Sequence, residues 1–112
     1  MQFKPLLPLT MTASGAITAE RFVTAAGAQV AAAGGAAIGV ARNSAADNEK
    51  MVVDTVGTAI IEAGGAIGKG AAVKAGADGR ALTYDTGTKV GVALQASTAA
   101  GQRIEILVIS AA

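Results

Sequence analysis

The sequence of 112 residues contains no cysteine and no histidine. Without cysteine there is no disulfide and no thiolate chemistry, and without histidine the commonest general base and transition-metal ligand are missing. The aspartates do not follow the alternating spacing of a calcium-binding loop. These absences argue against a hydrolase triad and a zinc site, so we expect no catalytic residue, no metal and no cofactor.

Aromatic and charged residues are also sparse. The three aromatic residues are Phe3, Phe22 and Tyr84, and nine basic residues are scattered singly through a chain of net charge +1. Nucleic-acid-binding proteins usually cluster their basic residues and add aromatic platforms for bases. The composition therefore predicts no nucleic-acid partner.

No stretch of the sequence predicts a membrane span. The longest uncharged run, residues 22–41, has twenty residues, of which nine are alanine and four are glycine. Alanine and glycine gain little from transfer into lipid, so this run does not favour a transmembrane helix. We also expect no secretory signal, because the N-terminus lacks a basic region followed by an apolar core.

Alanine and glycine dominate the sequence instead. There are 28 alanines and 15 glycines, so 43 of the 112 residues have a side chain no larger than a methyl group. Such a chain has few large side chains with which to fill a wide core. It suits thin, closely packed layers, or surfaces that are completed by a partner subunit.

From residue 13 onward, short apolar segments alternate with glycine-rich turns. Period-two alternation with frequent turns is typical of a small all-β barrel or sandwich, which we predict as one domain over residues 13–112. The expected strands lie in residues 36–41, 49–57, 58–65, 71–76, 79–85, 89–96 and 103–111. The alanine-rich residues 25–37, or residues 43–50, leave room for one short helix.

The segment AGGAIGKGAAV, residues 63–73, has the composition of a phosphate-binding loop without its spacing. Three residues separate Gly64 from Gly68, where the motif needs four, and Gly70 stands where the motif needs a hydroxyl residue. The glycine run at residues 34–39 likewise lacks the spacing of a dinucleotide-binding loop. We therefore interpret residues 63–73 as a glycine-rich corner that leads into a strand.

Two lysines raise the alternative of a small carrier or binding domain. Biotinyl and lipoyl carriers are small β structures with a modified lysine on a hairpin, and Lys50 or Lys69 could hold that position in this chain. Neither lysine has the tight Met-Lys-Met context of such carriers. A solvated surface lysine is the simpler interpretation of both.

Residues 1–12 differ from the rest and predict an extended N-terminal arm. Pro5 and Pro8 fix two backbone angles and disfavour both a helix and a central strand. An apolar arm either folds back on its own domain or docks on another chain. For the second case, the predicted partner-binding residues are Gln2, Phe3, Lys4, Pro5, Leu6, Leu7, Pro8 and Leu9.

The order of the sequence phrases adds a resemblance. AAIGVARNSA, then DTVGTAIIEAGGAIGKGAAVKAGADGRALTY, then GTKVGVALQASTAAGQRIEILVI combine Gly-Val-Ala strands with an Ala-Gly-Gly corner and Asp-Gly and Ala-Gly turns. This succession resembles the short β-rich head decoration proteins of tailed bacteriophages, also called capsid cement proteins. The resemblance covers roughly Ile17 to Ile109, and its motifs consist mostly of glycine, alanine and valine.

The resemblance implies a structural virion protein without catalytic activity. Such a protein is made in the bacterial host cytoplasm and binds the outer surface of the expanded head. It is expected to form a homotrimer, to bridge major capsid subunits and to stabilise the shell against internal DNA pressure. The alternatives are another phage structural β-module, such as a tail or fibre subunit, or a small carrier or binding domain.

Overall fold

The computed structural model describes residues 3–109, which form eight strands and no helix. This confirms the predicted all-β class, and the helix considered for residues 25–37 or 43–50 is not formed. No helix in the described part of the chain is long and apolar enough to cross a membrane. The strands are β1 (Pro5–Thr12), β2 (Phe22–Val23), β3 (Gly39–Ala41), β4 (Lys50–Glu62), β5 (Ala72–Ala75), β6 (Ala81–Thr83), β7 (Gly91–Ala93) and β8 (Arg103–Val108).

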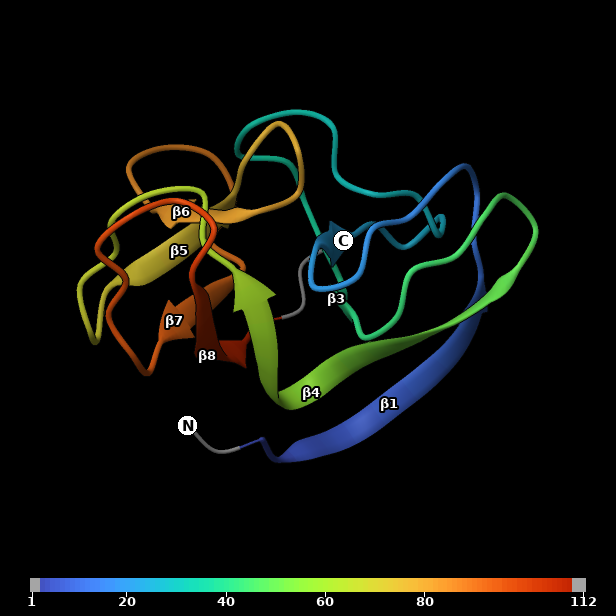
Figure 1. The fold of residues 1–112 in the computed structure, drawn as a ribbon, viewed down its shortest axis with the longest axis horizontal. Coiled ribbons are helices and arrows are strands. Elements are labelled where there is room, and N and C mark those ends of the chain that lie inside the picture. Colours follow the sequence, from blue (N-terminus) through green and yellow to red (C-terminus); the bar gives the residue numbers. More distant parts are fainter. Residues whose placement is uncertain (1–2, 110–112) are drawn as a thin grey trace.

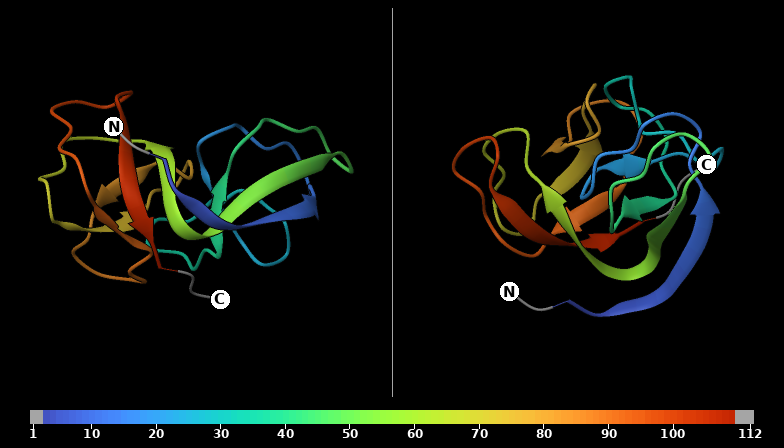
Figure 2. Two further views of the ribbon diagram at one scale, coloured as in Figure 1. Left: turned by 90° about the horizontal axis from the view of Figure 1, so that it is seen from below. Right: turned by 45° about the vertical axis from the view of Figure 1, so that its right-hand side comes forward.

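The strands form one strongly bent sheet that is nearly closed into a barrel. Its order is β2-β3-β4-β8-β7-β5-β6, and β1 lies outside this path and pairs with β4 alone. Figure 1 shows β1 and β4 as a long curved ribbon beneath the remaining strands, with β1 outermost. The two views of Figure 2 also show β1 beside β4 along most of the length of β1.

β4 is the one long strand, with thirteen residues, and it joins the two parts of the sheet. Its first half pairs with β1 and β3, and its second half pairs with β8. The sequence predicted two strands here, separated near Gly57. That prediction was wrong because Gly57 continues the strand with a φ of 97°, a conformation open to glycine at little cost.

The buried apolar residues form two clusters. The larger one contains Phe22 and side chains of β4, β5, β7 and β8, and the smaller one contains Met51 and Val53 of β4. On β7 the small residues Gly91 and Ala93 are buried, whereas Val92 is only half-buried. Small side chains thus face the core where strands approach closely, as the alanine and glycine content suggested.

The glycine-rich corner lies where the sequence predicted it. After β4 the chain turns through residues 63–71 and re-enters the sheet as β5. The Asp-Gly turn noted in the sequence is formed by Asp78 and Gly79 between β5 and β6, and Gly79 has a φ of 80°.

Candidate functional site

The candidate site is β1, the strand formed by most of the predicted arm. Residues 5–12 are extended and pair antiparallel with β4, from Pro5 opposite Gly57 to Thr12 opposite Lys50. Of the predicted partner-binding residues, Phe3 to Leu9 are described, and Gln2 lies outside the described residues. The arm therefore packs on its own domain, and it still presents much of its surface to solvent.

Several large apolar side chains gather along this ribbon. We call them the β1 surface, and their exposed fractions are Phe3 40%, Leu6 74%, Leu7 48%, Leu9 40% and Val56 45%. Val56 lies on β4 opposite Leu7 and was not among the predicted residues. Single exposed apolar residues are ordinary, whereas several of them along one strand and its partner are a candidate interaction surface.

The pairing of β1 with β4 is irregular around Leu7. The register shifts between Pro5 and Leu7 and again between Leu7 and Pro8. Such bulges re-aim side chains and are frequent at sheet edges. Leu6 and Leu7 are both exposed at this irregular part of the strand, and the next three residues of β1 are exposed as well.

Pro8 leaves the pairing with β4 intact because of its position in the strand. The backbone N–H of Ala13 donates to the carbonyl oxygen of Glu49, at 2.8 Å, so alternate residues from Ala13 back to Leu9 direct their backbone groups toward β4. Pro8 falls in the other set, whose backbone groups point away from β4. The pairing of β1 with β4 therefore loses no hydrogen bond through the missing N–H of Pro8. The missing donor lies on the outer edge of β1, where it makes the pairing of another strand less favourable.

Three side chains tie β1 to its neighbours. The Thr55 hydroxyl donates to the carbonyl oxygen of Leu7 at 2.7 Å, and Lys50 Nζ donates to the Thr12 hydroxyl at 2.6 Å. The backbone N–H of Lys4 donates to Thr58 Oγ1 at 2.7 Å, and the Thr58 N–H donates back to the Lys4 carbonyl at 3.1 Å. The strand is therefore held at both ends. Lys50, one of the two lysines considered for a carrier domain, takes part in this framework.

Phe3 continues this arrangement beyond the start of β1. The guanidinium carbon of Arg42 lies 5.2 Å from the centre of the Phe3 ring, within the range of a cation–π contact. Arg42 Nη2 donates to Asp54 Oδ1 at 2.6 Å and Arg42 Nε donates to Asp54 Oδ2 at 3.3 Å. The Asp54 side chain is 3% exposed, so Arg42 balances a buried charge. No sequence pattern predicted that these three residues would meet, because they lie far apart in the chain.

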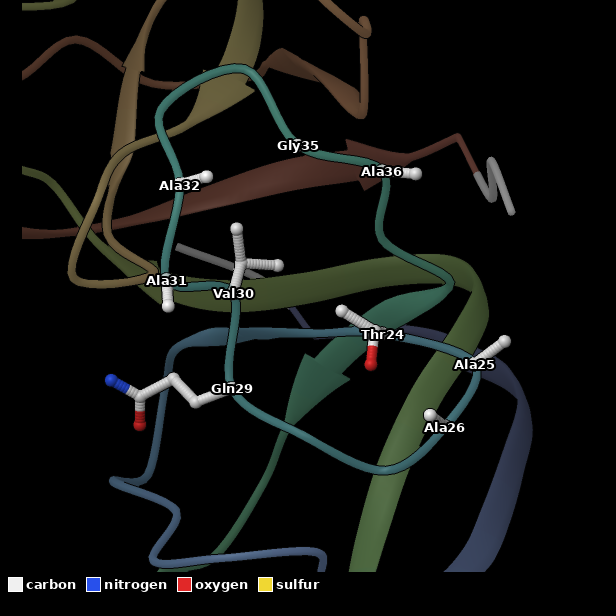
Figure 3. A pocket seen from close by; sticks show the side chains of 9 residues that line it. All are labelled: Thr24, Ala25, Ala26, Gln29, Val30, Ala31, Ala32, Gly35 and Ala36. Atoms are coloured by element: carbon white, nitrogen blue, oxygen red, sulfur yellow. The ribbon is translucent and has the colours of Figure 1, made fainter.

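A second candidate site is an open hollow of about 510 Å³ beside the loop between β2 and β3. Figure 3 shows it rimmed mainly by alanines, with Thr24 and Gln29 as its polar members. Gln29 Oε1 accepts from the backbone N–H of Thr18, and Gln29 Nε2 donates to the carbonyl oxygen of Asp78. The amide is thus engaged in joining loops, and the hollow presents mostly methyl groups.

Charged side chains cluster at the opposite end of β4. Glu62 pairs with Arg21 and with Arg80, each at 3.4 Å, and Arg80 also pairs with Asp78 at 2.7 Å. Burial opposes ionisation of Asp78, but hydrogen bonds from the Arg80 backbone and guanidinium prevail and hold the pKa of Asp78 below 3.8. Nearby, Arg103 pairs with Glu20. The mutual pairing of these charges indicates a structural role in linking β4, β8 and the β5–β6 turn.

The last features considered in the sequence are Lys69 and a metal site. Lys69, the other lysine considered for a carrier domain, is exposed in the turn before β5. Within residues 3–109 no three histidine, cysteine, aspartate or glutamate residues are placed to hold a metal ion together.

The comparisons with known proteins point in one direction. A model of the phage cement protein family matches residues 1–108. The fold is similar to that of the N base of head fiber gp8.5 in bacteriophage phi29, with a TM-score of 0.73 at 19% identity, over 94% of this chain and 97% of that one. No curated protein matched the sequence. The family match spans nearly the whole chain and implies a structural protein located at the capsid of the virion: this chain belongs to the phage cement protein family.

Proposed function

We propose that the protein binds the outside of the expanded phage head, bridges neighbouring major capsid subunits and stabilises the shell against internal DNA pressure. Family membership supports binding to a capsid. The observation that carries the proposal is the β1 surface, which is apolar and held in place by β4. A cement protein acts by adding contacts, so it needs such a surface and no catalytic group.

The proposed contact is made by residues Phe3 to Leu9 together with Val56, with Gln2 extending the same segment. The consecutive leucines Leu6 and Leu7 are both exposed, so the strand presents apolar groups in more than one direction. A strand of this kind fits against two adjoining surfaces, such as two neighbouring capsid subunits. Because Pro8 weakens the outer edge, we expect docking through side chains and not through addition of a strand.

We further propose that the functional unit is a homotrimer. The monomer has two small cores rich in alanine and valine, and closed symmetry lets such a domain bury more surface than it can alone. Three copies of β1 on one trimer would bind a shell by avidity, so each individual contact could remain modest. Trimers suit the three-fold and local three-fold positions of a phage head.

A second candidate is the base of a fibre attached to the head. The likeness to the N base of head fiber gp8.5 extends over 97% of that chain and favours this alternative among the other phage structural roles. Both roles require capsid binding. Electron microscopy of decorated heads distinguishes them, because a cement protein adds low protrusions and a fibre base carries a projecting shaft.

The test of the proposed function is co-sedimentation with heads of the same phage that lack this protein. Expanded and unexpanded heads are incubated with increasing amounts of the purified protein and pelleted. We expect saturable pelleting with expanded heads and none with unexpanded heads. A folded protein that pellets with neither form would overturn the proposal.

The contact surface is tested with a double variant, Leu6→Ser with Leu7→Ser. Its matched control is Leu94→Ser, which removes an exposed leucine outside the β1 surface. We expect the double variant to weaken head binding at least about tenfold, since burying each leucine contributes roughly 1.5–3 kcal/mol. Equal binding by the double variant and the control would place the capsid contact elsewhere on the protein.

A further inference from the structure

We infer that Phe3, Arg42 and Asp54 form a latch that positions the docking strand. This inference rests on the proposed function in one respect, namely that β1 is the strand that meets the capsid. It assigns a role to residues on β4 and directly after β3 that the sequence did not single out. In this role Arg42 touches no capsid residue, and it acts by holding the start of β1 in place.

The inner end of the latch is the carboxylate of Asp54. This side chain is 3% exposed and lies in the part of β4 that has β1 on one side and β3 on the other. A buried carboxylate needs a charged partner with good geometry, and Arg42 supplies two donors at 2.6 and 3.3 Å. Asp54 therefore holds the Arg42 guanidinium in position independently of the contact between Arg42 and Phe3.

The outer end of the latch is the Phe3 ring. A guanidinium that is already oriented by Asp54 presents a flat, charged surface, and the Phe3 ring centre lies 5.2 Å from its carbon. The next residue, Lys4, exchanges two hydrogen bonds with Thr58. Phe3 and Lys4 thus bind the chain to two points of the sheet directly before Leu6 and Leu7, the most exposed members of the β1 surface.

The consequence concerns affinity. A leucine pair on a frayed strand would have to be ordered when it docks, whereas a latched strand is already in the bound conformation. Releasing the latch should therefore weaken capsid binding even though the apolar side chains of Leu6 and Leu7 remain. The same release should accelerate hydrogen exchange at the start of β1.

The experiment compares Phe3→Leu with Phe3→Tyr. Leucine retains an apolar side chain without a π face, and tyrosine retains the ring, so only the first variant removes the cation–π contact. Amide exchange is followed by NMR at Lys4 and Thr58, with Val90 as an internal control because its N–H donates to Val73 within the larger core. In Phe3→Leu we expect exchange at Lys4 and Thr58 to be about two- to fivefold faster and head binding to be weaker by a similar factor. Phe3→Tyr should restore both.

Arg42→Lys completes a double-mutant cycle with Phe3→Leu. Lysine keeps a positive charge near Asp54 and so avoids an unpaired buried carboxylate, but it lacks the planar guanidinium. We expect the effects of the two variants on exchange at Thr58 to be non-additive. Additive effects, or unchanged exchange at Lys4 and Thr58 in Phe3→Leu, would overturn the latch.

The failures of the latch and of the proposed function are distinguishable. If Phe3→Leu weakens head binding while exchange is unchanged, Phe3 acts only through its own contact with the capsid and the latch is wrong, although the proposed function stands. If exchange is faster and binding is unchanged, β1 does not need positioning, which also overturns the inference. If the unaltered protein does not bind heads at all, the proposed function fails. That measurement uses no Phe3 variant, so its outcome is independent of the latch.

Discussion

At the scale of single residues, Gly57 decides whether β1 can lie against β4. Its φ is 97°, and a Cβ atom at this position would lie 2.4 Å from the carbonyl oxygen of Lys4 and 2.8 Å from the N of Leu6. Both atoms belong to the backbone at the start of β1 and directly before it, so they cannot move aside without loosening β1. Gly57 is half-buried on a long strand, and its position there carries a strict steric requirement.

We predict that Gly57→Ala lowers the free energy of unfolding by about 1–3 kcal/mol, because it combines an unfavourable φ with a backbone clash. Urea unfolding followed by circular dichroism measures the change. The control is Gly65→Ala, since a Cβ atom at Gly65 would meet nothing within 4 Å and its φ is not positive. A Gly57→Ala protein as stable as the control would mean that β1 shifts away from β4 at little cost.

Two exposed aspartates make stability depend on pH at the acid end. A hydrogen bond from Lys74, helped by the backbone N–H of Thr86, lowers the pKa of Asp85 below 3.8. The pKa of Asp78 is also lowered, because burial, which raises it, is outweighed by the hydrogen bonds with Arg80. A carboxyl group whose pKa is lower in the folded state stabilises the fold above its unfolded pKa, and this contribution is lost as the pH falls through the folded value.

We therefore predict that the double variant Asp78→Asn with Asp85→Asn is less stable than the unaltered protein near neutral pH. The difference should shrink as the pH is lowered from about 4 toward 2, where the aspartates of the unaltered protein become protonated. Urea midpoints across this range measure it. A difference that stays constant down to the lowest pH would show that the hydrogen bonds do not depend on the ionised carboxylates.

At the scale of elements, β1 adds to the sheet without being needed to close it. The path from β2 to β6 is continuous without β1, and the pairing of β4 with β3 and β8 does not involve β1. β1 does pack Met11 against the smaller core, close to Met51 and Val53. The segment before Met11 is therefore the part that can be removed with least damage to the cores.

We predict that deleting residues 2–9 leaves a folded β domain with lower stability and much weaker head binding. The far-ultraviolet circular dichroism spectrum should remain that of a β protein, with a cooperative thermal transition at a lower temperature. An unfolded product would mean that β1 belongs to the folding core. A folded product that binds heads as before would remove β1 from the proposed contact.

At the scale of the whole molecule, small cores and an exposed apolar ribbon favour association. Described residues outside β1 also include exposed apolar side chains, among them Leu107 in β8 and Ile109 directly after it. A protein that is stabilised by association has a melting temperature that rises with concentration, by mass action.

We predict a homotrimer in sedimentation equilibrium at micromolar concentration, with a melting temperature that increases on raising the concentration a hundredfold. A monomer of 10.8 kDa at every concentration would contradict the prediction. In that case avidity on the shell would have to come from neighbouring capsid sites.

The sequence by itself determined the class of the protein. Its period-two segments and glycine turns predicted an all-β domain, the spacing of residues 63–73 excluded a phosphate-binding loop, and Pro5 and Pro8 predicted an extended apolar arm. The all-β prediction is confirmed, and all three inferences rest on alternation, motif spacing and the backbone restriction of proline, which are local properties that need no knowledge of distant contacts.

Only the tertiary structure decided how the arm is held. Two expected strands are joined into β4, because Gly57 continues the strand with a positive φ. The absence of a Cβ atom at Gly57 also allows the start of β1 to approach β4. The pairing of these two strands brings Val56 beside Leu7. The tertiary structure also places Arg42 between the buried Asp54 and Phe3. Strand pairing and ion pairs between residues far apart in the chain depend on the register of the sheet, which residue alternation alone does not specify.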